Sequence, residues 1–224
     1  MTESALDGGR VTPGVVRVGD TVRRPVNDNS PFVHDLLRHL EGSGFAGAPR
    51  FLGIDERGRE VLSFIEGDVP DDIRPDYPEE TLREAALLIR AYHDATAGFA
   101  AKVVCHNDLG PPNTVFRDGS PVALIDFDAA APGARMYDLA YAVLLWVDLG
   151  SDERSLEEQG RRARAFLDAY EISLQAREVV DAMLERQRQT AESLRGRSRE
   201  MSDWWGARAA WLERNRAELE EALG

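Results

Sequence analysis

The sequence predicts an α+β protein in which a small strand-rich lobe precedes a larger, mainly helical lobe. Short β-branched runs separated by glycine and aspartate crowd the first 66 residues. Amphipathic patterns of helical period dominate the remaining residues. The predicted order is strands, a helix, strands, and then helices that enclose a small hairpin, which is typical of α+β proteins and not of alternating βαβ folds. A chain of 224 residues is long enough for two small lobes.

The first predicted element is a hairpin. Residues 15–18 and 21–24 are short runs rich in valine, and Gly19-Asp20 between them is a strong turn signal. Pro25 ends the second run, because proline cannot donate a hydrogen bond to a sheet. We therefore expect two paired strands before residue 25.

A helix and a second hairpin complete the first lobe. Apolar residues recur at helical spacing over residues 32–40, which predicts an amphipathic helix. Residues 49–54 and 60–65 are two further strand-like runs joined by a turn that contains glycine. An acidic stretch with proline then breaks the pattern. We place the lobe boundary there, between a lobe of residues 1–66 and a lobe of residues 67–224.

The second lobe is predicted to begin with a helix near Pro78, because proline and two glutamates suit a first helical turn. Short strands are expected at residues 103–105, 114–116 and 122–125. Residues 137–149 form a very apolar helix that we expect to be buried. From about residue 151, the pattern indicates two to four charged amphipathic helices.

The acidic composition bears on the choice of partner. Acidic residues outnumber basic residues by 40 to 27, which gives a formal net charge of -13. Nucleic acids and anionic membranes call for a basic surface, so this charge argues against both. A cationic small molecule is compatible with it, and so is a solvated acidic surface that aids solubility.

Cysteine usage and hydropathy predict a cytoplasmic protein. Cys105 is the only cysteine, which excludes an internal disulfide and a zinc site built from several cysteines. The first residues carry neither a basic region nor an apolar run, so no signal peptide is expected. The longest apolar stretch, near residues 140–147, is too short to span a bilayer.

Two acidic motifs contain the candidate catalytic and metal-binding residues. The first is HNDLGPPN, residues 106–113, and the second is IDFD, residues 125–128. The carboxylate of Asp108 can accept a hydrogen bond from an acceptor hydroxyl and orient it for in-line attack on a phosphate. Asn113 and Asp126 offer a neutral and a charged oxygen to magnesium, and Asp128 is a further carboxylate that can point the same way.

Each motif also has a plain structural explanation. A single Asp-x4-Asn pattern is typical of a turn or a cap. Both motifs together, each preceded by an apolar strand, favour phosphoryl transfer. We expect His106 to fix the loop and not to act as a base. His93 is expected to make a core or surface contact of its helix.

The two motifs, together with YDLA at residues 137–140, resemble the aminoglycoside phosphotransferase family of kinase-like small-molecule phosphotransferases. The resemblance is specific over residues 100–142 and weaker elsewhere. It implies the two-lobed protein-kinase fold, here with a reduced amino-terminal lobe. It also implies Mg²⁺ and a nucleotide donor, ATP or GTP.

The resemblance further implies roles for individual residues. Asp108 would be the catalytic aspartate, Asn113 and Asp126 would be magnesium ligands, and Asp138 would be an internal structural acid. Residues 63–66 would be the hinge between the lobes, whose backbone holds the adenine. Ile65 and Glu66 are the candidate nucleotide-binding residues of this hinge.

The first lobe departs from the kinase pattern in two ways. It lacks the glycine loop G-x-G-x-x-G, since the nearby glycines, which include Gly8-Gly9 and Gly14, do not have that spacing. It also lacks a lysine to bind the phosphates, because the chain's single lysine is Lys102. The nucleotide-binding residues of this lobe must therefore be of other types.

Val22, Arg23 and Arg24 stand where that lysine is expected. Strand alternation puts Val22 and Arg24 on one face, so Val22 can cover the adenine while Arg24 reaches the phosphates. Arg23 and Arg24 can equally be two exposed charges on an edge strand. The helix that follows lacks an obvious partner glutamate and offers His34 and Asp35 instead.

Three functions remain open from the sequence. The first is a kinase that transfers phosphate from a nucleotide to a small-molecule hydroxyl. The second is a degenerate kinase fold, such as an immunity-type protein that sequesters a small ligand or toxin. The third is a helical interaction protein whose motifs are fortuitous. The sequence gives neither the oligomeric state nor the acceptor.

An acidic stretch beside the predicted cleft bears on the acceptor. It contains Glu66, Asp68, Asp71, Asp72 and Asp76. A cationic acceptor and a solvated loop explain this stretch equally well.

Overall fold

An antiparallel sheet of five strands forms most of the amino-terminal lobe. In the computed structural model, which describes residues 3–5, 14–71, 76–173 and 175–224, the strands are β1 (Ser4–Ala5), β2 (Val16–Val18), β3 (Thr21–Arg24), β4 (Phe51–Ile54) and β5 (Glu60–Ser63). Their order is β1-β2-β3-β5-β4, so β3 is the central strand. Both predicted hairpins are confirmed, because β2 pairs with β3 and β4 with β5. Gly8-Gly9 and Asp72 lie outside the described residues.

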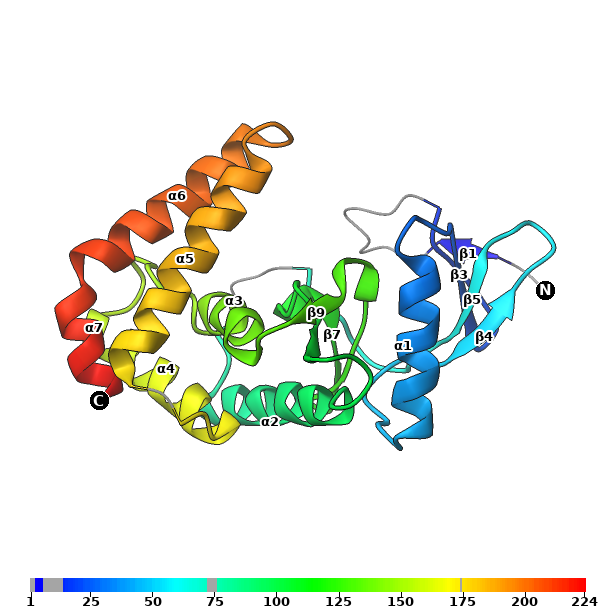
Figure 1. Cartoon of the computed structure of the whole chain (residues 1–224), viewed down its shortest axis with the longest axis horizontal. Coiled ribbons are helices and arrows are strands. Elements are labelled where there is room, and N and C mark those ends of the chain that lie inside the picture. The colour runs from blue at the N-terminus through cyan, green and yellow to red at the C-terminus, as the bar shows by residue number, and fades with distance from the viewer. Residues whose placement is uncertain (1–2, 6–13, 72–75, 174) are drawn as a thin grey trace.

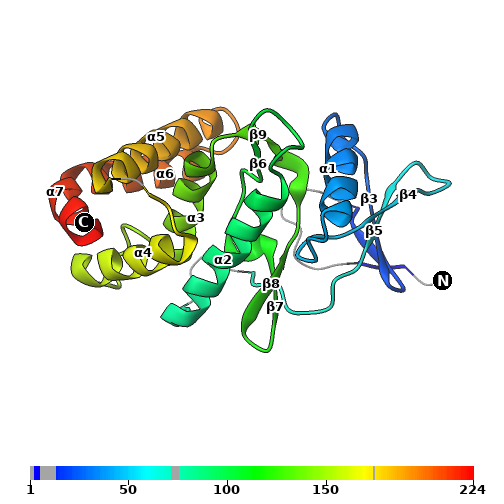
Figure 2. The ribbon, with the colours of Figure 1, turned by 60° about the horizontal axis from the view of Figure 1, so that its bottom comes forward.

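One helix packs against this sheet. The helix α1 (Ser30–Gly42) confirms the helix predicted over residues 32–40 and buries Leu36, Leu37 and Leu40. Its His34 stacks on Phe51 of β4, with 3.8 Å between the ring centroids. Figures 1 and 2 place α1 between the sheet and the helical lobe. The helix is therefore in a position to carry side chains toward both lobes.

The linker between the lobes passes close to the second lobe. The backbones of Asp68 and Phe116 exchange hydrogen bonds of 2.9 and 2.7 Å. Gly67 has a φ of +147°, and a Cβ atom there would lie 2.3 Å from the carbonyl oxygen of Phe116. Glycine meets both demands, the backbone conformation and the close approach. The contact lies directly after the lobe boundary predicted at residue 66.

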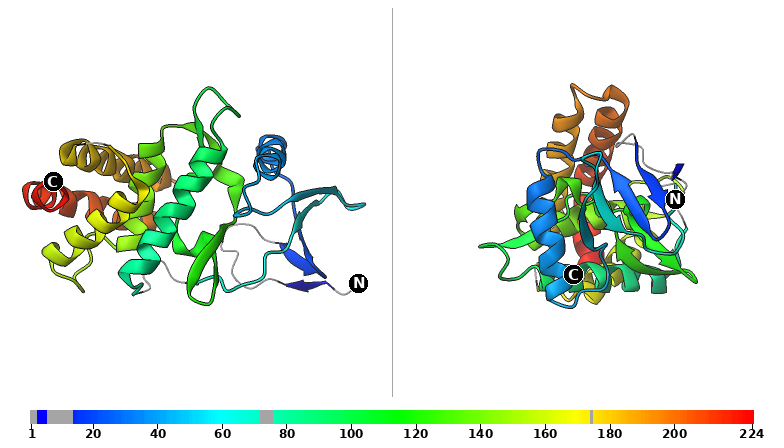
Figure 3. Two further views of the ribbon diagram at one scale, coloured as in Figure 1. Left: turned by 90° about the horizontal axis from the view of Figure 1, so that it is seen from below. Right: turned by 90° about the vertical axis from the view of Figure 1, so that its right-hand side faces the viewer.

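The second lobe is mainly helical. Its helices are α2 (Glu79–Ala95), α3 (Arg135–Val147), α4 (Leu156–Tyr170), α5 (Ala176–Leu194), α6 (Arg199–Arg214) and α7 (Arg216–Leu223). The apolar helix predicted at residues 137–149 is α3, and it is buried as expected. Helices α5 and α6 form a hairpin that projects from the lobe (Figure 1). Figure 3 shows the two lobes at opposite ends of the long axis.

Four short strands between α2 and α3 flank the two acidic motifs, which lie in the connections between them. β7 (Thr114–Arg117) and β8 (Ser120–Leu124) form a hairpin whose turn lies at Asp118-Gly119. β6 (Val103–Cys105) pairs with β9 (Ala131–Gly133). The sequence analysis missed β9 because Ala-Pro-Gly lacks the β-branched and aromatic residues that mark strands. The β6–β9 pair ties the start of the first motif to the segment that follows the second.

None of the described helices is long and apolar enough to cross a membrane.

Candidate active site

A buried aspartate of α3 fixes the loop that carries the first motif. The carboxylate of Asp138 accepts the backbone N–H of His106 at 2.7 Å and that of Asn107 at 2.8 Å. Asn107 has a φ of +68°, a conformation in which a regular sheet or helix cannot satisfy its amide. Asp138 thus accepts hydrogen bonds from two backbone amides that regular secondary structure would leave unpaired in this turn.

Asp138 is in turn held by histidine. Its side chain is completely buried, and Oδ2 lies 3.0 Å from Nε2 of His93. Burial by itself raises the pKa of Asp138, but the hydrogen bond and charge of His93 and the contacts of His106 outweigh burial and lower it. Nδ1 of His93 lies 2.7 Å from the hydroxyl of Tyr170. His93 is therefore a core residue, as expected, and supports Asp138 from α2.

The carboxylate of Asp108 is held at both oxygens. The hydroxyl of Tyr141 donates to Oδ1 at 2.8 Å, and the amide nitrogen of Asn113 donates to Oδ2 at 2.8 Å. Tyr141 lies one turn beyond Asp138 on α3, and its ring packs between Arg186 and Trp205. Burial and the charge of Asp108 raise the pKa of Tyr141 well above its usual value, so its hydroxyl is neutral and donates. The sequence analysis missed Tyr141.

The second motif begins where β8 ends. Asp126 has a φ of 64° and begins a single 3-10 turn, η2 (Phe127–Ala129). The amide of Ile125 donates to the carbonyl of Asn113 at 2.9 Å, and Nε2 of His106 donates to the carbonyl of Ile125 at 3.0 Å. These backbone contacts bring the two motifs together. His106 fixes the loop, as predicted.

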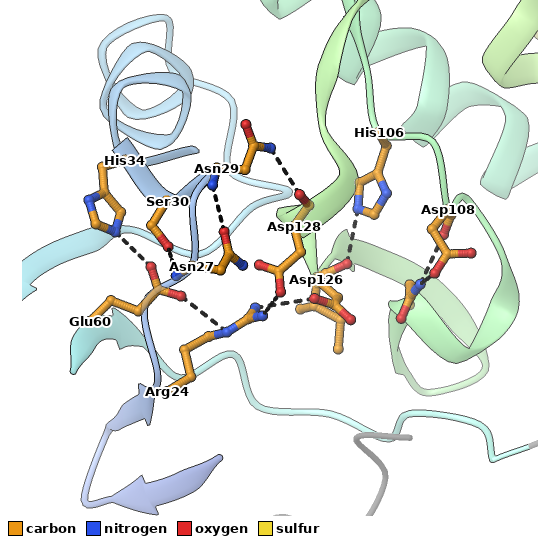
Figure 4. A network of polar contacts seen from close by, with 12 residues as sticks. Arg24, Asn27, Asn29, Ser30, His34, Glu60, His106, Asp108, Asp126 and Asp128 are labelled. Atoms are coloured by element: carbon orange, nitrogen blue, oxygen red, sulfur yellow. Dashed lines mark hydrogen bonds and ion pairs between the residues drawn. The ribbon is translucent and has the colours of Figure 1, made fainter. Parts of the chain in front are cut away.

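Arg24 of β3 reaches across to this second motif (Figure 4). Its Nη1 lies 3.2 Å from Oδ1 of Asp126, and its Nη2 pairs with Oδ2 of Asp128. The arginine is buried, with 7% of its surface exposed, and β3 is central, so the alternative of an exposed edge-strand charge is wrong for Arg24. Burial raises the pKa of Asp128, an effect that Arg24 opposes and that neighbouring Asp126 strengthens. Arg24 is thus the cation between two close carboxylates.

The acidic partner of Arg24 comes from β5 and not from α1. Nε of Arg24 forms an ion pair with Oε1 of Glu60 at 3.1 Å, and the two residues are direct neighbours in the β3–β5 register. His34 of α1 contacts the other oxygen of Glu60 at 2.7 Å. Glu60 is buried, so a charge-compensating partner is required. The sequence analysis named His34 but missed Glu60, whose position opposite Arg24 depends on the strand register.

Arg23 and Val22 occupy opposite faces of β3. Arg23 forms an ion pair with Asp55 at 3.7 Å, which directs it to the face opposite Arg24. Val22 is half-buried on the same face as Arg24, paired with Leu62 in the register. Strand alternation therefore brings Val22, but not Arg23, to the side of the acidic motifs.

The hinge candidates Ile65 and Glu66 lie in the linker. Both line a surface hollow of about 490 Å³ on the side of the α1–β4 connection, whose lining contains neither Asp108 nor Asp126. Glu66 is exposed, pairs with Arg17 at 2.7 Å, and accepts a hydrogen bond from Arg117 at its carbonyl. The guanidinium of Arg17 also stacks 3.6 Å from the ring centroid of Phe64. Arginines thus engage the linker from both lobes.

The acidic stretch beside the linker is partly neutralised. Besides the pair of Glu66 with Arg17, Asp76 pairs with Arg154 at 2.5 Å. The backbone of Asp68 holds the linker through its hydrogen bonds with the backbone of Phe116. The stretch is therefore less negative than its sequence suggests.

The residues of the second motif fit a magnesium ion that shares its coordination with a nucleotide. Mg²⁺ is usually held by one or two carboxylates together with phosphates and water. Asp126 and Asp128 already present oxygens to a common cation, and the carbonyl of Asn113 accepts the amide of Ile125, the residue before Asp126. Among the residues that the structure describes, no group of three or more His, Cys, Asp and Glu side chains could hold a metal ion.

The model of the phosphotransferase enzyme family matches residues 33–183, more than half of the chain. The chain belongs to this family. The match runs from α1 into α5 and includes both acidic motifs. It confirms the family resemblance of the sequence and leaves β1 to β3, with Arg24, outside the matched range.

Individual proteins and solved structures are also similar to the chain. A trifolitoxin immunity protein of Rhizobium leguminosarum bv. trifolii is 34% identical over an alignment of 256 positions, with 96% of each protein covered. A choline/ethanolamine kinase family protein from Mesorhizobium loti has a TM-score of 0.67 at 14% identity, covering 100% of this chain and 92% of that one. The ADP-bound aminoglycoside phosphotransferase APH(2'')-Ib has a TM-score of 0.57 at 13% identity, covering 88% and 90%. These structures confirm the predicted kinase-like fold.

Proposed function

We propose that this phosphotransferase-family chain is a small-molecule kinase that moves the terminal phosphoryl group of ATP or GTP to a hydroxyl group. The observation that carries the proposal is the Asp108 carboxylate, which Tyr141 and Asn113 hold at both oxygens. Each carboxylate oxygen has two lone pairs, so Asp108 can still accept a hydrogen bond from an acceptor hydroxyl. A carboxylate fixed in this way orients the hydroxyl for in-line attack.

The proposed nucleotide site lies between Asp108 and β3. Asn113, Asp126 and Asp128 would hold Mg²⁺, which when bound offsets the negative charge of the phosphates. Arg24, which is always charged, would bind the phosphates with its planar fork. Val22 would cover the base from the same face of β3, and the linker at Ile65 and Glu66 would contact its edge. In the view of Figure 4, Asp126 lies between Arg24 and Asp108.

The acceptor would approach Asp108 beside Tyr141. The ring of Tyr141 is backed by Arg186 of α5 and Trp205 of α6. The identity of the acceptor would then be set by α3, α5 and α6. A cationic acceptor agrees with the net charge of -13, although arginines neutralise part of the acidic stretch near the linker.

A second candidate is an immunity-type protein that binds a toxin without phosphorylating it. The full-length similarity to a trifolitoxin immunity protein favours it. The absence of a lysine from β3 agrees with a site that has lost catalysis. The same molecule could bind under either candidate function, because a toxin with a hydroxyl group could be a substrate or a sequestered ligand.

Asp108→Ala separates the two candidates, with trifolitoxin as the probe. If the chain is a kinase, transfer of label from γ-labelled ATP or GTP to the toxin falls roughly 10²- to 10⁴-fold, and sensitive cells lose protection. Nucleotide affinity should stay close to that of the unmodified protein. Asp118→Asn, in the exposed β7–β8 turn, is the matched control. A variant that protects cells as well as the unmodified protein would favour sequestration and reject the kinase.

A further inference from the structure

The Arg24 side chain occupies the position between the two carboxylates that are proposed to hold a metal. Its Nη1 faces Oδ1 of Asp126 and its Nη2 faces Oδ2 of Asp128. The arginine side chain is 9% exposed, whereas those of Asp126 and Asp128 are 36% and 29% exposed. The carboxylates are thus open to solvent while the cation between them is enclosed.

Arg24 and a divalent cation cannot use the same oxygens at once. A guanidinium donates N–H groups to the oxygens it contacts and cannot lose its proton in a protein. A divalent ion that reached these oxygens would meet a fixed positive charge at short range, where repulsion is strong in a partly buried site. Binding of a metal to Asp126 and Asp128 therefore requires the fork of Arg24 to move away.

Arg24 also has an ion-pair partner outside the second motif, which can retain it while its fork turns. Nε is paired with the buried carboxylate of Glu60, which His34 holds from α1. The lobes are also joined independently of the arginine, because the side-chain amide of Asn29 donates to the carbonyls of Asp128 and Ala130 at 2.9 and 3.0 Å. The fork can therefore leave the carboxylates while Nε stays on Glu60 and the lobes stay together (Figure 4).

We propose that Arg24 is an exchangeable internal cation, which neutralises Asp126 and Asp128 in the nucleotide-free protein and releases them when a metal–nucleotide complex binds. The fork then turns to the phosphates, with Glu60 as its positioning residue. This inference rests on the proposed function, since it takes the second motif as the metal site. Its consequence is that the metal alone binds weakly and the nucleotide promotes metal binding, a coupling that acts equally in both directions.

The test compares Mn²⁺ binding in the absence of nucleotide, measured by electron paramagnetic resonance of the free ion. Arg24→Gln should bind Mn²⁺ about tenfold more tightly than the unmodified protein, because the competing cation is gone. Arg23→Gln is the matched control, since it removes the same charge one residue away on the opposite face of β3. It should change the affinity less than twofold. Equal or weaker binding by Arg24→Gln would overturn the inference.

A substitute variant and a second measurement with nucleotide complete the test. If Arg24→Gln does not fold by circular dichroism, Arg24→Lys takes its place, because one ammonium cannot bridge both carboxylates while it pairs with Glu60. We then expect roughly threefold tighter Mn²⁺ binding, and no gain overturns the inference. If every variant binds Mn²⁺ equally and only with nucleotide, the inference fails while the proposed function stands. If none binds Mn²⁺ with or without nucleotide, the proposed metal site fails as well.

Discussion

The two sides of the candidate site are held in different ways. On the side of the helical lobe, Asp108 stands on a loop whose backbone amides donate hydrogen bonds to the completely buried carboxylate of Asp138. On the side of the sheet, Arg24 is held by ion pairs that cross between the lobes to carboxylates about one third exposed. Hydrogen bonds to a completely buried carboxylate are costly to break, whereas the ion pairs of Arg24 end on carboxylates that solvent and a ligand can reach.

The two sides of the candidate site therefore differ in how firmly they are held. The helical lobe holds Asp108, the group proposed to orient the acceptor, on a fixed loop. The sheet lobe carries Arg24, whose charge is proposed to change partners when a metal–nucleotide complex binds. Substitutions on the two sides should therefore have different effects, with losses of stability on one side and shifts of ligand affinity on the other.

The largest expected effect tests the rigid side. Asp138→Asn should lower the free energy of unfolding by about 3 kcal/mol at neutral pH, because the amide cannot accept all of the hydrogen bonds that the buried carboxylate accepts, and their donors are left unsatisfied. The pKa of Asp138 is lowered in the folded protein, so its contribution is complete above the usual value of 3.8 and is lost as the pH falls through the lowered pKa. Urea unfolding of the two proteins should therefore converge as the pH falls below 3.8.

Asp118→Asn is the control for that experiment, since Asp118 is exposed and asparagine tolerates its positive φ. It should change the free energy of unfolding by less than about 0.5 kcal/mol. If Asp138→Asn unfolds like this control, Asp138 does not fix the loop.

A smaller effect is expected on the exchangeable side. Arg24→Ala should weaken the affinity for a magnesium–nucleotide complex roughly tenfold, because charge-assisted hydrogen bonds contribute about 1.5 kcal/mol or more. Calorimetry with ATP and GTP measures the change. Arg23→Ala should leave the affinity as it is, since Arg23 pairs with Asp55 on the other face of β3. Equal losses in the two variants would mean that net charge, and not the position of Arg24, determines the affinity.

The smallest effect tests how far Asp108 depends on its neighbours. Tyr141→Phe removes one hydrogen bond to the Asp108 carboxylate, worth about 1 kcal/mol, and keeps the ring between Arg186 and Trp205. We expect kcat to fall roughly fivefold while the KM for the nucleotide stays constant. Steady-state kinetics with a transferred label separates the two constants. A change confined to the nucleotide KM would show that Tyr141 acts on the nucleotide site instead.

Local pattern predicted most of the fold. Both hairpins of the first lobe, α1 and the apolar α3 follow from turn residues and hydrophobic period, and the structure confirms them. The strand β9 was not predicted, because its Ala-Pro-Gly sequence carries no strand signal and its pairing depends on β6. Long-range pairing of this kind is not visible in a local window of sequence.

Long-range contacts also limited what the sequence could predict about the site. Asp108, Asn113, Asp126 and Asp128 stand in two short motifs, so their spacing alone indicated their chemistry. Glu60 and Tyr141 reach the site through strand register and helix packing, from residues far away in the chain. Strand alternation did place Arg24 on the correct face, but its burial follows from the position of β3 at the centre of the sheet.

Nucleotide affinity measured with and without Mg²⁺ tests the central claim most directly. Calorimetric titration of the protein with ATP and with GTP should show binding of at least one nucleotide, at least tenfold tighter in the presence of Mg²⁺ than in EDTA. Asp126→Asn should remove most of that difference. No binding of either nucleotide at millimolar concentration, or equal binding with and without Mg²⁺, would contradict the claim that both sides of this site meet on a metal–nucleotide complex.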